Sequence, residues 1–398
     1  MNCIWIKQRF TVLLTLFDYD RYSDKMKIKQ VTSSDRKAIK QFIDFPFKLY
    51  QYTEQWVPPM RSEMKKIFEP TYPFYKYGDA AFILAQNGNG ETLGRLAVVN
   101  NHRYNDFHKS KTAFFYYFET VDDPDVADAL FSWGFDWIKS QGLNHIFGPK
   151  GLMVLDGFGM LVKGFEHQPV FGQSYNPDYY PGFIETLGFK KVKDVFTGRI
   201  DRNTDFPEKV LRAAELVKKR LGFWSPRLRT KAELKSVIND FKVLYNNSLA
   251  GPAGNPPITD GDMNAMVSQL LWIADPKLVK LLYKEDEPVG WMLGYPNISD
   301  GLKKANGRLF PTGWAKILLE SKRTSRIILN GIGIIEDYQR MGGTAILLSE
   351  VYNSVMQGSR YDQAELLQLR EENINILLEV SNFDIDFHKT HRLYEKFL

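Results

Sequence analysis

The chain has 398 residues, of which 44% are hydrophobic and 25% are charged, and its formal net charge is +5. These values are typical of a globular protein of two domains. Lysine and arginine are spread along the chain and form no run that could follow a nucleic-acid backbone, which argues against nucleic acid as a partner. A single cysteine, Cys3, excludes an internal disulfide framework and a cysteine-based zinc site, and it favours a cytoplasmic protein.

Aromatic residues make up 14% of the chain, with 28 Phe and 20 Tyr. A bulky core explains this excess, and so does an apolar pocket or groove for a long hydrophobic ligand. No segment reaches the roughly 18 continuous apolar residues of a membrane span, although peripheral contact with the inner membrane face stays open.

We expect residues 1–25 to be an extension upstream of the folded domains. The apolar run at 10–17 follows basic residues as in a signal peptide, but it is short, and acidic residues follow in place of a cleavage site. From Met26 the pattern predicts a short strand, a Ser/Asp cap and a helix.

A first domain is predicted over residues 26–201. Strands at 80–86 and 92–101 flank Gly-Asn-Gly, which indicates a hairpin, and apolar residues at helical spacing predict a helix over 124–140. The other predicted elements are strands at 112–120, 144–149 and 189–200 and a helix at 177–188.

The second predicted domain, residues 202–398, repeats this order without detectable sequence identity. Its predicted helices cover 205–221, 230–248, 260–273, 343–357 and 373–382. Its predicted strands cover 277–285, 288–296, 326–336, 363–370 and 390–397, and 297–325 is an insertion. The pattern predicts an α/β (α+β) protein in which each half is a mixed, twisted sheet flanked by helices.

The turn between the strand 326–336 and the helix 343–357 reads Gln-Arg-Met-Gly-Gly-Thr at 339–344. Glycine is common in tight turns because it accepts a positive φ. Alternatively, the first N–H groups of the helix are left to hold an anion, as phosphates are held at helix N-termini. The corresponding crossing in the first half, at 118–131, is acidic and would repel a phosphate. Only the second crossing is therefore predicted to bind an anion.

This order of elements resembles the GNAT superfamily of acyl-CoA N-acyltransferases. The turn resembles their pyrophosphate loop, Gln/Arg-x-x-Gly-x-Gly/Ala, with matches at Gln339 and Gly342 and a departure at Thr344. The resemblance implies coenzyme A or acyl-CoA as donor, an amine as acceptor, and no metal. The residues that it places against the coenzyme are Ile334, Ile335, Gln339, Arg340, Met341, Gly342, Gly343, Thr344 and Asn373.

Stretches at 148–166, 174–194, 308–319 and 392–398 resemble tandem GNAT-like bacterial proteins related to the bacterial ceramide synthases. Those enzymes transfer a fatty acyl chain from acyl-CoA to the amine of a sphingoid base, and the first half would then supply substrate surface without binding coenzyme. The alternatives are a small-molecule N-acetyltransferase, a peptidyl or aminoacyl transferase, and a non-catalytic protein that binds acyl-CoA or lipid.

Amine acylation needs a base for the ammonium proton and a donor for the departing thiolate. Many GNAT enzymes use a tyrosine as the donor, but its expected place near Val380 holds none, so Tyr394 is the candidate unless the thiolate leaves unaided. Candidate bases are Glu336 at the strand end, His108, and Asp156, whose apolar surroundings would raise its pKa unless it finds partners. Asp156 is otherwise a simple turn residue.

Tyr175, Asn176 and Tyr179 precede a predicted helix, either as a substrate wall or as a capped helix start packed by aromatic side chains. Trp314 lies in the inserted segment 307–323, whose apolar and basic residues could cover a hydrophobic groove, rest on an anionic bilayer, or pack on their own domain. The histidines lack the acidic companions of a metal motif, so we expect no metal.

Overall fold

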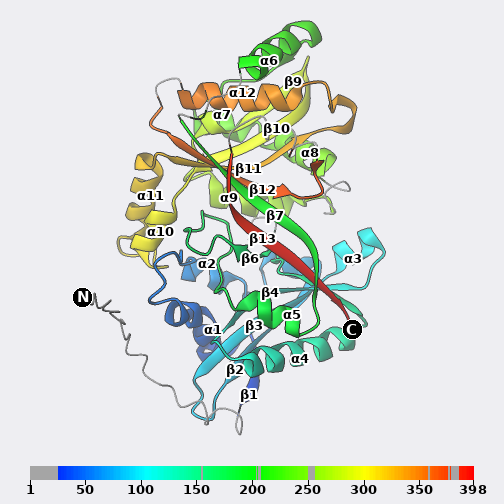
Figure 1. Cartoon of the computed structure of the whole chain (residues 1–398), viewed down its shortest axis with the longest axis vertical. Coiled ribbons are helices and arrows are strands. Elements are labelled where there is room, and N and C mark those ends of the chain that lie inside the picture. Colours follow the sequence, from blue (N-terminus) through cyan, green and yellow to red (C-terminus); the bar gives the residue numbers. More distant parts are fainter. Residues whose placement is uncertain are drawn as a thin grey trace, which may run out of the picture.

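The computed structural model of the chain describes residues 26–153, 156–202, 204, 208–249, 256–356, 359–374, 377 and 385–398. Thirteen strands in these ranges form a single mixed sheet with helices on both faces, which confirms the α/β class (Figure 1). In the same ranges, no helix is long and apolar enough to cross a membrane.

The strands follow one path across the sheet, and a thirteenth strand, β6 (Met160–Lys163), pairs with β13 beside it. In spatial order the path is β1 (Lys27–Val31), β2 (Gly78–Gln86), β3 (Thr92–Asn101), β4 (Thr112–Thr120), β5 (His145–Gly148), β13 (Asp386–Phe397), β7 (Lys190–Asp201), β12 (Gln363–Arg370), β11 (Arg326–Ile334), β10 (Glu287–Pro296), β9 (Lys280–Lys284) and β8 (Phe223–Trp224).

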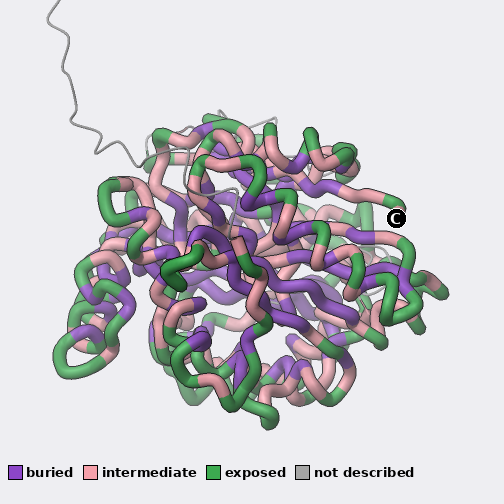
Figure 2. The backbone as a smooth tube through the Cα atoms, turned by 90° about the horizontal axis from the view of Figure 1, so that it is seen from below, coloured by how far each residue is buried: buried purple, intermediate pink, exposed green. Residues whose placement is uncertain are grey.

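The helices cover the two faces of each half. In the first half they are α1 (Arg36–Leu49), α2 (Arg61–Lys66), α3 (His102–His108), α4 (Pro124–Ser140) and α5 (Tyr180–Thr186). In the second half they are α6 (Glu208–Leu221), α7 (Lys231–Ser236), α8 (Ile238–Leu249), α9 (Asp260–Leu270), α10 (Ser299–Ala305), α11 (Gly313–Arg323) and α12 (Gly343–Met356). The core strands are buried between these layers (Figure 2).

Local sequence explains why the main elements form where they do. The side chain of Asp123 caps α4, and Pro124 begins it, while Val126 and Leu130 point into the core as their helical spacing predicts. The structure corrects the sequence at two places. Residues 102–108 form α3, although no helix was predicted between the strands 92–101 and 112–120, and the predicted helix 230–248 is two helices, α7 and α8. The predicted helix 373–382 lies largely outside the described residues.

The last strands of the two halves are exchanged. β13, from the end of the chain, pairs with β5 of the first half, while β7 of the first half pairs with β12 of the second. β7 and β13 also pair with each other along most of their length and run through the middle of the molecule (Figure 1). The proposed units 26–201 and 202–398 therefore each complete their sheet with the other's final strand.

Candidate active site

The central strands β11 and β12 form a fork. They pair in parallel only as far as Leu329 and Leu366, after which β11 continues beside β10 and β12 continues beside β7. Backbone groups on the two inner edges are then unpaired with each other from Asn330 onward, and such edges are open to an extended ligand. The carboxyl ends of parallel strands are also where open α/β sheets bind ligands.

The turn that follows β11 is fixed by bonds to its surroundings. Ile335 N–H donates to the Val289 carbonyl (3.0 Å), and the Gln339 side chain donates to the Ile334 carbonyl (3.2 Å). Arg340 and Gly342 adopt left-handed φ values of 63° and 84°, and α12 begins directly afterwards. The turn therefore has one defined shape.

The structure explains why each of the two turn positions, 342 and 343, is occupied by glycine. Gly342 needs its positive φ, and a Cβ there would lie 3.0 Å from Val217 Cγ2 of α6. A Cβ at Gly343 would lie 3.0 Å from Ile334 Cδ1, so glycine lets α12 approach the sheet. The positive φ therefore explains the glycine at Gly342, as is usual in tight turns. It does not say what the backbone N–H groups of the turn bind.

The N-terminus of α12 is uncapped by side chains. No side chain of the described residues accepts a hydrogen bond from the backbone N–H groups of 340–345, and Ile346 N–H is the first to bond back, to the Gly342 carbonyl (3.2 Å). Such N–H groups, together with the positive end of the helix dipole, attract a phosphate. At the matching crossing of the first half, Asp123 already accepts from the Asp125 N–H (2.9 Å). That carboxylate occupies the place that a phosphate would need.

Asp156 has the environment of a general base. Its Oδ2 accepts the N–H of Met153 (2.8 Å), and burial raises the pKa of this carboxyl to about 6 in spite of backbone hydrogen bonds that lower it. Tyr72 and Tyr117 lie close enough that, after burial, the charge of Asp156 is the next cause of their raised pKa. A carboxylate with a pKa near 6 is ionised at neutral pH and can accept a proton from an ammonium.

Side chains of the two halves meet near Asp156, and another pair of side chains lies beside the fork. Tyr77, whose pKa Asp156 helps to raise, donates to Asp262 Oδ1 of α9 (2.7 Å). In the second half, Tyr245 of α8 stacks on Trp291 (ring centroids 5.8 Å apart), and a Cβ at Gly331 would lie 2.8 Å from the Trp291 ring. The sequence carries no signal for four residues of this region, because they come from separate parts of the chain and no regular sequence spacing relates them. They are Tyr77, Asp262, Tyr245 and Trp291.

An apolar cavity lies between α8, α9 and β10. Its volume is about 70 Å³, and its lining includes Phe241, Met266, Leu293 and Tyr295. The Tyr295 hydroxyl accepts a hydrogen bond from the side chain of Asn330 (3.2 Å), the residue at which the fork opens. The cavity therefore adjoins the fork on the face of the sheet opposite to α12.

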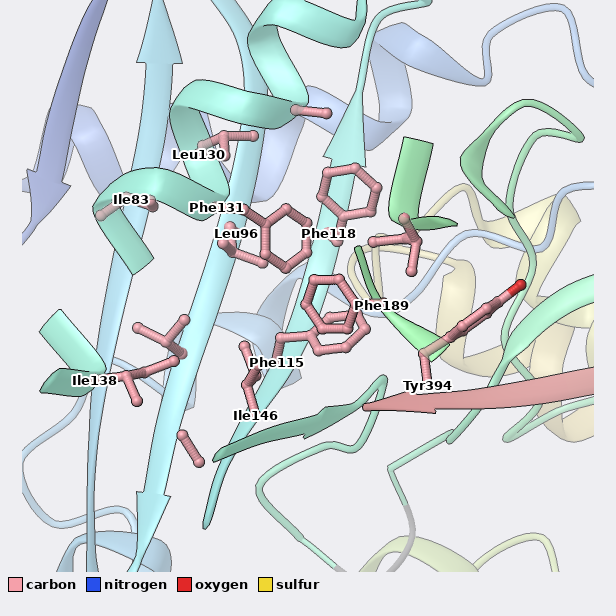
Figure 3. Close-up of a cluster of buried hydrophobic side chains, with 14 of the residues drawn as sticks. Ile83, Leu96, Phe115, Phe118, Leu130, Phe131, Ile138, Ile146, Phe189 and Tyr394 are labelled. Atoms are coloured by element: carbon pink, nitrogen blue, oxygen red, sulfur yellow. The ribbon is translucent and has the colours of Figure 1, made fainter. Parts of the chain in front are cut away.

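The other predicted catalytic residues are dispersed. Glu336 is exposed in the turn, and His108 is exposed on α3 with its ring 4.3 Å from that of Tyr104. Tyr394 is fully buried in the core of the first half, and its hydroxyl donates to Glu185 (3.0 Å) at the edge of that core (Figure 3). Two strands, β7 and β12, separate β13 from β11, so the structure does not bring Tyr394 to the turn.

The predicted substrate residues lie in ordinary structural positions. The side chain of Asn176 bonds both backbone groups of Leu161, at 2.7 and 3.1 Å, and thereby holds β6 in place. Tyr179 donates to the Thr120 carbonyl (2.8 Å) and Tyr175 to the Phe165 carbonyl (3.2 Å). These bonds favour the packed helix start over a substrate wall. Trp314 is 48% exposed on α11.

Two further expectations concern the region after β12 and the absence of a metal. The backbone N–H of Asn373 donates to the Arg370 carbonyl (3.0 Å), and the expected place of the missing tyrosine, near Val380, lies outside the described residues.

Over the described ranges, no group of three or more His, Cys, Asp or Glu side chains is placed to hold a metal ion.

Comparison with known proteins identifies the fold. The chain is 26% identical over 371 residues to Protein YghO of Escherichia coli (strain K12), covering 92% of this chain and 94% of that protein. It is 25% identical over 370 residues to Bacterial ceramide synthase of Caulobacter vibrioides (strain NA1000 / CB15N), covering 90% and 95%. A solved tandem GNAT protein from the clavulanic acid biosynthesis pathway matches with a TM-score of 0.53 at 7% identity, covering 94% of this chain and 98% of that one. No protein-family model matches the sequence.

Proposed function

We propose that this chain, which has the tandem GNAT fold, is an acyl-CoA-dependent N-acyltransferase whose second half binds the coenzyme. One observation carries the proposal: of the two strand-to-helix crossings, only the one at 339–344 presents a helix N-terminus that no side chain of the described residues caps. The backbone N–H groups there would hold the diphosphate, and the acyl-pantetheine arm would enter the fork between β11 and β12. The first half, 26–201, would contribute the acceptor side.

The chemistry needs few groups once both substrates are placed. The ammonium of the acceptor gives a proton to Asp156, the free amine forms a C–N bond to the thioester carbonyl carbon, and the C–S bond breaks. The nitrogen of the new C–N bond then loses a second proton to solvent, and the thiolate of coenzyme A leaves unaided or takes up a proton from solvent, because Tyr394 is not at the turn. Glu336, beside the turn, is the second candidate base.

A long acyl chain and a lipid-like amine, such as a sphingoid base, are the substrates that we propose. The apolar cavity beside Tyr295 and Asn330, with its volume of about 70 Å³, would receive a short part of the chain after it passes the fork. Each buried CH₂ adds about 0.8 kcal/mol, so palmitoyl-CoA should exceed acetyl-CoA in kcat/KM by orders of magnitude. The relative named a ceramide synthase supports the same substrate class. Equal kcat/KM for both donors would favour a small-molecule N-acetyltransferase.

Calorimetric titration with coenzyme A tests the turn. Gly342→Asp and Gly342→Asn place side chains of nearly equal size at φ 84°, so they share the backbone strain and differ in charge. We expect the Asp variant to bind coenzyme A at least tenfold more weakly than the Asn variant, because its carboxylate would repel the diphosphate. Gly142→Asp, at a φ of 73° in open space in the first half, is the control and should bind normally. Equal affinity of the two Gly342 variants would remove the turn from the proposal.

Release of free thiol separates enzyme from binder. Palmitoyl-CoA is incubated with a panel of sphingoid, small-molecule and aminoacyl amines, and thiol is measured with a chromogenic disulfide. The absence of a tyrosine near Val380 favours a non-catalytic acyl-CoA-binding protein, which would release none. Preference for an aminoacyl acceptor would indicate a peptidyl or aminoacyl transferase.

A further inference from the structure

A basic groove lies far from the fork, between α1, α2 and the segment before α11. Its volume is about 780 Å³. Five basic residues line it and only two acidic ones, Asp44 and Glu69. The basic residues are Arg36, Lys40, Arg61, Lys65 and Arg308. This excess of positive charge suits an anionic ligand.

The charges of the groove are only partly neutralised. Asp44 pairs with both Lys40 (2.8 Å) and Arg61 (3.0 Å). Within the described part of the chain, the side chains of Arg36, Lys65 and Arg308 form no salt bridge, and all three are exposed. Three cations are therefore available to phosphate groups from solution.

The segment 303–323 continues the basic surface and adds apolar groups to it. It holds six basic residues and one acidic residue, Glu320, which is 13% exposed and paired with Lys304. Between these cations, three large apolar side chains face solvent: Phe310 (78% exposed), Trp314 (48%) and Leu319 (46%). Exposed aromatic and aliphatic residues interspersed with cations are typical of surfaces that lie in a membrane interface.

The groove and this segment form one rigid surface. Arg61 donates from its backbone to the Gly307 carbonyl (3.0 Å) and from its side chain to the Asn306 carbonyl (2.7 Å). Gly307, at a φ of 68°, lies so close to Phe47 that a Cβ would be 2.6 Å from the ring. The segment is thus attached to the first half.

We propose that this surface, the groove together with Phe310 and the exposed face of α11, docks the protein on a bilayer that contains anionic phospholipids. Phosphate head groups enter the groove, and the apolar side chains enter the interface between head groups and acyl chains. Charge complementarity selects this occupant: a neutral bilayer would leave three cations without partners, and a soluble anion would leave three apolar side chains in water. Docking does not depend on the acyltransferase activity, although it would bring the protein to lipid substrates.

Vesicle co-sedimentation of the full chain tests the proposal. We expect binding to phosphatidylcholine vesicles that contain about 30% phosphatidylglycerol, and little binding to phosphatidylcholine alone. Lys65→Ala/Arg308→Ala should weaken binding about 25-fold, at about fivefold for each basic residue near an anionic surface. Phe310→Ser should weaken binding as well, and about 1 M salt should reduce it because the Debye length falls to about 3 Å.

The control removes the same charges elsewhere. Lys219→Ala/Arg220→Ala also deletes one lysine and one arginine, from the exposed surface of α6, and should keep full binding. Leu216→Ser, at a side chain 53% exposed on α6, is the control for Phe310→Ser. Equal losses in test and control variants would overturn the proposal. Displacement of the protein from vesicles by soluble glycerol 3-phosphate would also overturn it, in favour of a soluble anionic ligand.

Discussion

Replacement of Asp156 by asparagine should change stability and activity in opposite directions. Asparagine keeps the size of the side chain and an oxygen that can accept the N–H of Met153, but it cannot ionise. Burial raises the pKa of Asp156 from 3.8 to about 6, so folding disfavours the charged carboxylate. The protonated carboxyl carries no such cost, so the free energy of unfolding is not reduced below about pH 4. The reduction appears as the pH rises through 6.

The expected magnitude follows from that shift. The ionised carboxylate costs at most about 3 kcal/mol of folding free energy at pH 8, at about 1.4 kcal/mol for each pKa unit. Asp156→Asn should therefore unfold at a higher urea concentration than the parent at pH 8, and the advantage should shrink toward pH 4. Its kcat/KM should fall by about 10²–10⁴, the usual loss of a general base, and the parent's activity should rise with pH through about 6.

Urea titrations at several pH values and thiol-release kinetics supply both measurements. Asp128→Asn, at an exposed position on α4, should leave both unchanged. A variant that is less stable than the parent at pH 8 would show that partners stabilise the carboxylate, and the reasoning from burial would fail. If Asp156→Asn is more stable than the parent but has the same kcat/KM, Asp156 is not the base, and Glu336 becomes the candidate.

The remaining predictions concern buried polar side chains. Lys389→Met should destabilise the fold by up to about 3–5 kcal/mol in urea titrations, because it removes the ammonium 3.0 Å from the buried carboxylate of Glu365, which then relies on His388 at 3.3 Å. The double variant Lys389→Met/Glu365→Leu should recover most of that loss, and failure to recover would show that the two residues act separately. Asn176→Ala should cost about 2–3 kcal/mol through the loss of its bonds to Leu161 and should leave KM for the acceptor unchanged. A large rise in that KM would restore Asn176 as a substrate residue.

The order of elements was predictable because the signals for each element are contiguous. The hairpin at 78–101, the helix from Pro124 and the turn at 339–344 each depend on residues that are neighbours in sequence. Periodicity and turn chemistry therefore locate them without knowledge of the fold. The proposed anion site could be predicted for the same reason, since the backbone N–H groups of one turn would form it.

The other residues of the proposed acceptor side were not predictable from the sequence, because they meet only in three dimensions. Tyr77 and Asp262 are joined by a 2.7 Å hydrogen bond across 185 positions of sequence, and no local pattern relates them. The sequence left Asn176 open as either a substrate contact or part of a helix start, because its partner, the four-residue strand β6, is too short to leave a periodic signal. The exchange of the last strands was not predicted for a similar reason. The sequence of a strand specifies which of its faces is buried, but not which strand it pairs with.

The position of β13 also determines when the sheet of the first half can be completed during synthesis. Residues 386–397 leave the ribosome well after β5 and β7, yet they fill the gap between these two strands in the half that is made first. Until then, the edge of β5 is open and able to pair with another nascent chain. The first half must wait, partly assembled, until β13 has been synthesised, and chains released before residue 386 would be prone to aggregate through that edge.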